Sequence, residues 1–279
     1  VDTIRAGNTD LFGRLQSFQV LAHPTDIAPD ELLEQAARLI SATIAQANIA
    51  PAALVGVGIG ASGLVDPATG VNVLAPNLGW RNVPMHAFFA QRLKLPVYVD
   101  NNVRAMALAE AMFGAGRGVN TLAFVYSRIG VGAGFVVGGE VYRGSRAGAG
   151  EIGHTTMIPA GGAPCRCGNT GCLETLVSEP EIVRQARVLA ARAPDSILAA
   201  ELMKDERRRT QDEVGAGAFG LPPPVSVGEV SEIGADEALN TPIERVFAAA
   251  RAGDRETQAL LDERAMYMGT ALANLVTLI

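Results

Sequence analysis

Residues 153–174 read GHTTMIPAGGAPCRCGNTGCLE and gather all three cysteines of the chain into one short stretch. The cysteines follow the spacing C-x-C-x4-C, and a histidine stands upstream of them. Three thiolates and one imidazole form the closed tetrahedral set that zinc prefers in structural sites. The stretch therefore predicts one structural zinc ion on His154, Cys165, Cys167 and Cys172. Three unrelated buried cysteines, or a catalytic thiol paired with His154, stay open as alternatives.

The two ends of this stretch carry acidic residues. Glu151 comes three residues before His154, and Glu174 comes two residues after Cys172. A metal that fixes the loop would also fix both carboxylates, and rigid carboxylates are suited to accept hydrogen bonds from the vicinal hydroxyls of a sugar. Two exposed surface glutamates would give the same pattern.

Length and composition indicate a globular protein with room for two domains. The chain has 279 residues, 48% of them hydrophobic, and a net charge of −6. This balance argues against a nucleic-acid surface in this part of the protein. No stretch approaches the roughly 20 apolar residues of a membrane span, and the N-terminus lacks the order of a signal peptide, so we expect a cytoplasmic protein. The chain opens without methionine and closes on the apolar MGTALANLVTLI, so we expect a fragment truncated at both ends.

The order of predicted elements indicates an α/β protein. A strand pair, a helix from Pro29, a strand in ALVGVGIG, a helix near 84–94, the strand PVYV and a helix over 102–113 alternate in the first half. We expect a smaller α/β domain over residues 1–117, with an incomplete first strand. We expect a larger α/β domain over 118–279 that holds the zinc loop at 154–172. A helical and irregular excursion is predicted at about 193–241, on the surface rather than in the core.

Two glycine-rich segments resemble nucleotide-binding loops only superficially. GIGASG at 58–63 matches G-x-G-x-x-G, but LVDPATG follows where a helix should begin, which argues against a dinucleotide site. GVGAG at 130–134 leads into a strand that folds back at Gly138-Gly139 as a hairpin. Its glycines are better explained by close backbone approach.

Several blocks resemble the signature of the ROK family, which groups repressors, open reading frames and sugar kinases. The blocks are GEIGHTT with CRCGNTGCLE, and, earlier in the chain, GLVDPATG, APNLGW and VDNNVRAMALAEAMFGAGRG. The resemblance implies a two-domain actin-like ATPase fold of the ribonuclease H-like kind, with a sugar in the interdomain cleft. It also implies zinc on His154 and the three cysteines. The matching sugar-site positions are Asn101, Asn102, Glu151, His154 and Glu174, with Gly63 and Asn77 nearby.

Three departures from the family pattern bear on catalysis. The block written V-E-N-D-x-N in the kinases reads VDNNVR, which puts Asn102 at the position of the general base, while Asp100 should point elsewhere. An amide binds a hydroxyl but does not take its proton. Arg128 and Ile129 stand where the second phosphate loop should have glycine and threonine, and VDT replaces the end of the first phosphate loop.

These departures favour a sugar-sensing effector domain of a NagC/XylR-type transcriptional regulator, with kinase chemistry lost and ATP not expected as a cofactor. Its ligand would be a monosaccharide or sugar phosphate. DNA would be bound through an N-terminal winged helix-turn-helix that is not present in this chain, in a homodimer or higher homo-oligomer. An ATP-dependent, glucokinase-like sugar kinase and a dimerising scaffold that binds a partner protein are the alternatives.

Overall fold

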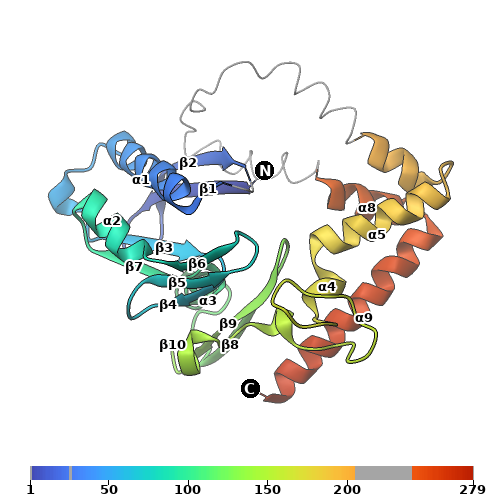
Figure 1. Ribbon diagram of the computed structural model, residues 1–279. Helices are drawn as coiled ribbons and strands as arrows, with labels where there is room; N and C mark the ends of the chain where they lie inside the picture. The colour runs from blue at the N-terminus through green and yellow to red at the C-terminus, as the bar shows by residue number, and fades with distance from the viewer. Residues whose placement is uncertain (1, 25–26, 205–240, 279) are drawn as a thin grey trace. The chain divides into compact units, whose positions relative to one another are not determined.

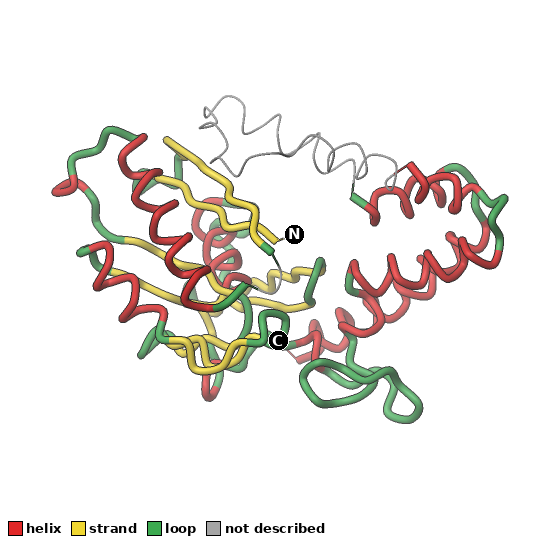
Figure 2. The backbone as a smooth tube through the Cα atoms, turned by 45° about the horizontal axis from the view of Figure 1, so that its top comes forward, coloured by secondary structure: helices red, strands yellow, loops and turns green. Residues whose placement is uncertain are grey.

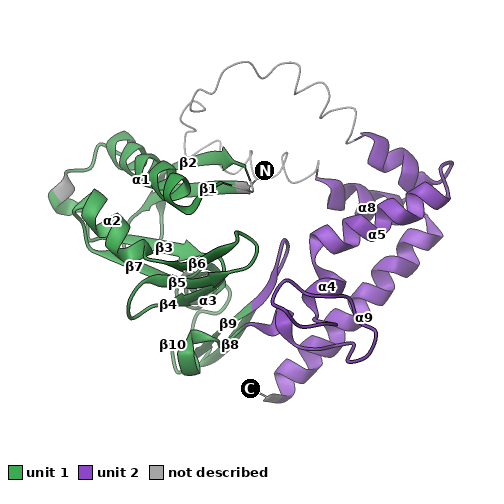
Figure 3. Ribbon diagram, viewed as in Figure 1, with its two compact units in different colours: residues 1–125, 133–150, 221–231 green, residues 126–132, 151–220, 232–279 purple. Residues whose placement is uncertain are grey.

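The computed structural model describes residues 2–24, 27–204 and 241–278, which form two compact units (Figure 3). Among these residues, unit 1 comprises 2–125 and 133–150, and unit 2 comprises 126–132, 151–204 and 241–278. This division differs from the boundary that we expected after residue 117. The segment 133–150 belongs to unit 1 although it follows that boundary in the sequence.

In its described residues, unit 1 is built mainly of strands, with three helices packed on them (Figure 1). Its strands are β1 (Asp2–Thr9), β2 (Leu15–His23), β3 (Val57–Ala61), β4 (Leu64–Asp66), β5 (Val71–Ala75), β6 (Trp80–Val83) and β7 (Val97–Asn101). Its helices are α1 (Pro29–Gln46), α2 (Met85–Leu93) and α3 (Asn102–Phe113), with a 3-10 turn η1 (Pro51–Ala53). β1 and β2 are antiparallel, whereas β3 and β7 are parallel. The helix-strand alternation predicted from the sequence is confirmed.

The core of unit 1 lies between α1, α2 and one face of the β3–β7 pair. Val97 and Val99 point into it beside Phe89 of α2 and Leu33 of α1. The other face carries Gly60, where a Cβ would lie 3.2 Å from the Cα of Asn102. The absence of a side chain therefore lets the start of α3 approach the sheet. Since β3 leads into β4 and not into a helix, GIGASG is not part of a dinucleotide-binding unit.

The antiparallel sheet β4-β5-β6 was not predicted from the sequence. Its strands are short. The segment GLVDPATG contains a turn in which Asp66 accepts hydrogen bonds from the Ala68 amide at 3.0 Å and the Thr69 hydroxyl at 2.8 Å. Those contacts close the β4–β5 hairpin. The predicted strand in ALVGVGIG is shorter than expected, because Ala53 ends η1 and the strand β3 begins only at Val57.

A further sheet contains β8 (Thr121–Ser127), β9 (Val131–Val137) and β10 (Glu140–Tyr142) in the order β10-β9-β8. Gly138 and Gly139 have φ of 62° and 83°, as a tight hairpin turn requires, so the predicted hairpin is confirmed. A Cβ at Gly134 would lie 2.5 Å from the Ala107 Cβ of α3. This close approach packs β9 on α3 and explains why 133–150 belongs to unit 1.

Unit 2 is mainly helical beyond its long loop (Figure 2). Its elements are the 3-10 turn η3 (Ile152–His154), α4 (Glu174–Val177), α5 (Glu179–Arg192), α8 (Pro242–Arg251) and α9 (Arg255–Leu278). Residues 197–204 are also helical, and Leu198 and Leu202 pack with Val246 in the core. The start of the excursion predicted at 193–241 is therefore core helix, because its leucines are spaced one turn apart. Residues 205–240 lie outside the described part of the chain.

Within the described ranges, no helix combines the length and apolar character needed to cross a membrane. α9 is long enough, but charged residues interrupt its first half: Arg255, Glu256, Asp262, Glu263 and Arg264.

Asp254 joins α9 to the helix at 197–204. Its carboxylate accepts hydrogen bonds from the Thr257 amide and hydroxyl at 3.0 and 2.9 Å and from the Leu198 amide at 3.1 Å. Burial alone would raise the pKa of Asp254, but these hydrogen bonds hold the pKa below its usual value. The ionised carboxylate therefore stabilises the folded state at neutral pH.

We expect Asp254→Ala to lower the free energy of unfolding at pH 7 by about 1–2 kcal/mol, as loss of a helix cap does. Because the folded pKa is depressed, the contribution is complete above the unfolded pKa of about 3.9 and declines as the pH falls through the folded value. Urea denaturation at pH 7 and pH 3 should show the difference between wild type and variant shrinking. Asp262→Ala, on the exposed side of α9, is the control. An equal difference at both pH values would contradict this assignment.

Candidate functional site

The four predicted metal ligands come together in unit 2. The ligand atoms of His154, Cys165, Cys167 and Cys172 all lie within 4.8 Å of one another. His154 Nδ1 is 3.6 Å from Cys165 Sγ, and Cys167 Sγ is 3.8 Å from Cys172 Sγ. In a zinc tetrahedron with the usual bond lengths, the sulfur-sulfur edge is about 3.8 Å and the nitrogen-sulfur edge about 3.5 Å. The donor set and its spacing thus fit a tetrahedral zinc ion.

The chain folds around this cluster through short backbone ladders. Bridges join Thr156 to Cys172 and Pro164 to Thr170, and the Cys165 amide donates to Asn169 O at 2.7 Å. Gly171 has φ of 66°, and a Cβ there would lie 1.9 Å from Ile158 O. Only glycine fits this crossing, which brings Cys172 back beside His154.

The three thiols lie close together and differ in pKa: burial opposes ionisation of Cys167, but hydrogen bonds, led by that from the Asn169 amide, lower its pKa. Burial, followed by hydrogen bonds with Cys165 and Cys167, raises the pKa of Cys172 to about 12. Burial likewise raises the pKa of Cys165. Three sulfur atoms this close repel one another as thiolates, and a divalent cation would offset that repulsion.

Both glutamates predicted for the sugar site border the metal loop. Glu151 directly precedes η3, and the His154 amide donates to Glu151 O at 3.1 Å, so one helical turn links them. Glu174 is the first residue of α4, and its Oε2 accepts a hydrogen bond from the Val131 amide at 3.0 Å. Arg166 Nη2, from the metal loop, lies 3.9 Å from Glu174 Oε1. The hydrogen bond from the start of β9 therefore orients the Glu174 carboxylate, and Arg166 adds an exposed, long ion pair.

The remaining predicted sugar residues belong to unit 1. Asn101 is buried and caps α3, since its Oδ1 accepts from the amides of Val103 at 2.8 Å and Arg104 at 3.1 Å. Its Nδ2 donates to Gly63 O at 2.8 Å, so these two predicted residues are neighbours. One amide N–H of Asn101 is left for a ligand.

Asn102 and Asn77 are less engaged. Asn102 begins α3, is half-buried, and its side chain makes no hydrogen bond to any residue that the structure describes. Asn77 lies in the turn between β5 and β6 and is also half-buried. Of the two side-chain amides at the start of α3, that of Asn102 thus has more free hydrogen-bonding capacity than that of Asn101.

Sequence reasoning did not identify the role of the two arginines that surround Asp100. Arg104 Nε donates to Asp100 Oδ1 at 2.7 Å, while Arg143 Nε and Nη2 donate to Oδ2 at 3.1 and 3.0 Å. The Asn101 amide donates to Oδ1 as well, at 2.7 Å. The available signal was the i,i+4 spacing of Asp100 and Arg104, with the arginine on the apolar side of its helix.

The segment that would form the second phosphate loop is tied to α5. Arg128 Nε donates to Glu179 Oε1 at 3.0 Å, and the Glu179 amide donates to Arg128 O at 2.8 Å. The hydrogen bond to Glu179 raises the pKa of Arg128 above its usual value. Ile129 is exposed. Arg128 and Ile129 thus place a side-chain ion pair and an exposed apolar side chain in this segment.

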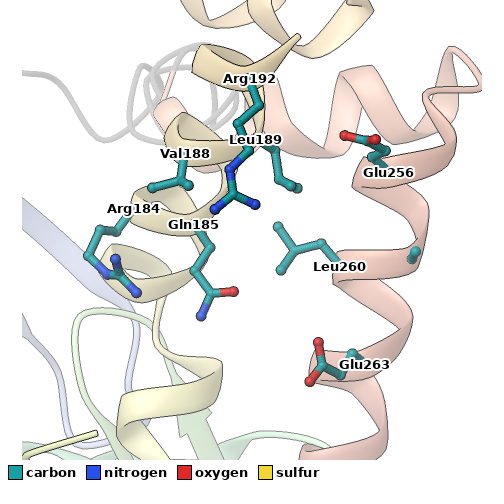
Figure 4. Close-up of a pocket in the computed structure, with 9 residues that line it drawn as sticks. Arg184, Gln185, Val188, Leu189, Arg192, Glu256, Leu260 and Glu263 are labelled. Atoms are coloured by element: carbon teal, nitrogen blue, oxygen red, sulfur yellow. The ribbon is translucent and has the colours of Figure 1, made fainter.

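A groove of about 410 Å³ lies elsewhere in unit 2, between α5 and α9 (Figure 4). Val188, Leu189 and Leu260 line its apolar part. Charged side chains border it: Arg184 and Arg192 on α5, and Glu256 and Glu263 on α9. None of the sugar-site or metal residues predicted from the sequence lines this groove, so it is separate from the candidate site.

Comparisons with known proteins agree with this geometry. The sequence matches the ROK family over residues 2–279, and the chain belongs to that family. It is 36% identical over 222 residues to a glucokinase of Halalkalibacterium halodurans, covering 80% of this chain and 57% of the relative. It is 33% identical over 249 residues to a xylose repressor of Caldicellulosiruptor bescii, covering 89% of this chain and 54% of the relative.

The solved structure of a ROK family transcriptional regulator, a homologue of the E. coli MLC protein, superposes with a TM-score of 0.72 at 25% identity. The match covers 99% of this chain and 60% of that one. The chain thus has the actin-like ATPase fold of the family, as the sequence predicted. It spans little more than half the length of the curated relatives, which include both kinases and repressors.

Proposed function

We propose that this chain is the sugar-sensing effector domain of a ROK-type transcriptional regulator. Its ligand is a monosaccharide or sugar phosphate. The proposed binding residues are Asn101, Asn102, Glu151, His154 and Glu174, with Gly63 and Asn77 as further candidates. The similarity to xylose repressors supports a regulatory role. DNA would be bound by a winged helix-turn-helix outside this chain, in a homodimer or larger assembly, because operators generally have two-fold symmetry.

The hydrogen bonds that Asp100 accepts from two arginines are the main observation against kinase chemistry. Transfer of phosphate to a sugar requires a carboxylate that takes the proton of the attacking hydroxyl. The amide of Asn102 has no such basicity. Asp100 is the adjacent acid, but both of its oxygens accept hydrogen bonds from arginines. Neither position therefore offers a free carboxylate to a substrate.

The metal in this proposal is structural zinc. His154 turns Nδ1 toward Cys165, so Nε2 is the ring nitrogen that could donate to a sugar hydroxyl. Bound zinc would supply a cross-link that holds Glu151, His154 and Glu174 in a fixed relation. A complete set of four protein ligands leaves no open position for catalysis. The sugar would bind two arrangements of the units with different affinity. Binding would thereby shift the balance between these arrangements, and this shift would act on the attached DNA-binding modules.

A sugar kinase is the second candidate, favoured by the 36% identity to a glucokinase. A sugar panel should therefore be screened by thermal shift on the full-length protein, and each hit tested in a coupled ATP-turnover assay and for its effect on operator binding. We expect at least one hit that changes operator affinity and shows no ATP-dependent turnover. ATP-dependent phosphorylation of a hit would overturn the proposal, and unchanged operator affinity would remove its regulatory part.

Asn102→Asp tests the same point from the opposite direction. Restoring a carboxylate at this position is expected to give no measurable phosphoryl transfer, because Arg128 and Ile129 still occupy the phosphate loop and catalytic contributions of this kind are coupled. The control is the wild-type protein with the same sugar in the same assay. A gain of turnover in Asn102→Asp would show that the phosphate loop is functional.

A further inference from the structure

Arg104 is the largest fully buried side chain of the described chain, and neither the predicted site nor the metal loop includes it. Only 1% of Arg104 is exposed, although it carries a positive charge. Its guanidinium donates from Nε to Asp100 Oδ1 at 2.7 Å, from Nη1 to Ala147 O at 2.6 Å and from Nη2 to Val65 O at 2.8 Å. All three nitrogens are therefore engaged, which allows a charge to stay buried.

The three acceptors belong to three different segments of unit 1. Asp100 lies in β7, directly before Asn101. Val65 lies in β4, two residues after Gly63. Ala147 lies in the turn between β10 and Glu151. A planar guanidinium can hold three acceptors in a fixed relation, whereas the single ammonium of lysine cannot reproduce that fork. Arg104 thus fixes β4, the start of α3 and the 143–150 loop relative to one another.

The 143–150 loop is strained and is held at several points. Arg146 and Ala147 both have φ of 55°, a left-handed conformation that costs free energy in residues other than glycine. Arg104 binds the carbonyl of the second of these residues. Arg143, at the start of the loop, binds the other oxygen of Asp100. At its end, Gly150 O accepts from the Ala133 amide at 2.7 Å, and Glu151 follows in the chain.

We infer that Arg104 is a positioning residue that couples the asparagine side of the sugar site to the 143–150 loop, and through that loop to Glu151. The inference rests on the proposed function for the identity of the site. A sugar that hydrogen-bonds to Asn102, or to the remaining side-chain N–H of Asn101, contacts the start of α3, the helix that contains Arg104. Any shift of the start of α3 changes the hydrogen bond from Arg104 to the Ala147 carbonyl. The strained 143–150 loop then becomes less or more ordered.

The first experiment uses the full chain without sugar and measures amide hydrogen exchange. In Arg104→Met, which keeps much of the volume, and in Arg104→Lys, which keeps the charge, we expect peptides covering 143–150 to exchange at least tenfold faster. The β1–β2 hairpin should be unchanged. Arg143→Met is the matched control, since that arginine binds the same carboxylate but is exposed, and its effect should be several-fold smaller. Wild-type exchange of the loop in both Arg104 variants would overturn the inference. If both variants unfold, Asp100→Asn loosens the same guanidinium and gives the same readout.

The second experiment adds a sugar that binds the wild type. We expect wild type to gain protection together at 99–106 and at 143–151. In Arg104→Lys at saturating sugar, only 99–106 should gain protection, which loss of stability alone would not produce. Joint protection in the variant would overturn the coupling. If no sugar binds wild type, the proposed function fails, while the sugar-free experiment still decides the role of Arg104 in holding the loop.

Discussion

Cys172→Ser is expected to abolish stoichiometric zinc binding and to destabilise unit 2 more than any other single change discussed for this chain. Cys172 is fully buried, and its Sγ lies 3.8 Å from Cys167 Sγ and 3.7 Å from His154 O. Structural zinc contributes directly to folding free energy, about 10–16 kcal/mol in small zinc peptides. Even a loss of about 4 kcal/mol would lower the unfolding midpoint of a chain of this size by about 10 °C.

Elemental analysis of purified protein and differential scanning calorimetry test this prediction. Thr170→Ala is the matched control, because Thr170 is exposed on the same loop and is not a ligand. Chelation of the wild type should reproduce the destabilisation of Cys172→Ser and have no further effect on that variant. Substoichiometric metal in the wild type, with stability unchanged by a chelator, would show that the cluster is not a zinc site.

Glu174→Ala is expected to weaken sugar binding by about 10-fold to 150-fold, the equivalent of about 1.5–3 kcal/mol for a hydrogen bond to a charged acceptor. The structure strengthens this expectation because the Val131 amide orients the carboxylate before a ligand arrives. Preorganisation of this kind lowers the cost of binding. Isothermal titration calorimetry with a sugar from the panel measures the effect.

Two further variants separate charge from shape at this position. Glu174→Gln keeps the volume and one acceptor oxygen, so it should retain part of the affinity. Glu179→Gln breaks the ion pair with Arg128 and should leave sugar affinity unchanged, since neither residue is among the proposed sugar ligands. If Glu174→Ala bound sugar with wild-type affinity, Glu174 would not belong to the site. If Glu174→Ala and Glu179→Gln lost affinity equally, the loss would indicate a general effect on folding.

The metal loop could be predicted from the sequence because its chemistry is local. Four ligands within one short segment need only the chain between them to come together, and the structure places them as expected. The larger helices and paired strands were predictable for a similar reason, since periodicity and turn residues lie in the same window. The sheet β4-β5-β6 was not, because strands as short as Leu64–Asp66 give too little alternation to be distinguished from turns.

The arginine network around Asp100, by contrast, could not be predicted from the sequence. Arg104 finds its acceptors 39 and 43 residues away, at Val65 and Ala147, and both are backbone carbonyls. Every residue has a backbone carbonyl, so the sequence does not indicate which carbonyl an arginine binds. Only the tertiary structure shows it. The contact between Glu174 and the Val131 amide is hidden for the same reason. Candidate residues for the site could be named from the sequence by their type, whereas the contacts that orient them could not.

The confinement of all metal ligands to residues 154–172 also bears on the order of events during synthesis. The loop packs on a small cluster with Val131 and Leu173, and α9 covers that cluster with Tyr267 and Met268. At about 5–20 residues per second, the ribosome needs roughly 5 to 20 seconds to make the following hundred or so residues. Metal capture can therefore precede arrival of the helix that completes the cluster. Zinc present during translation should therefore be able to organise the loop before α9 is complete.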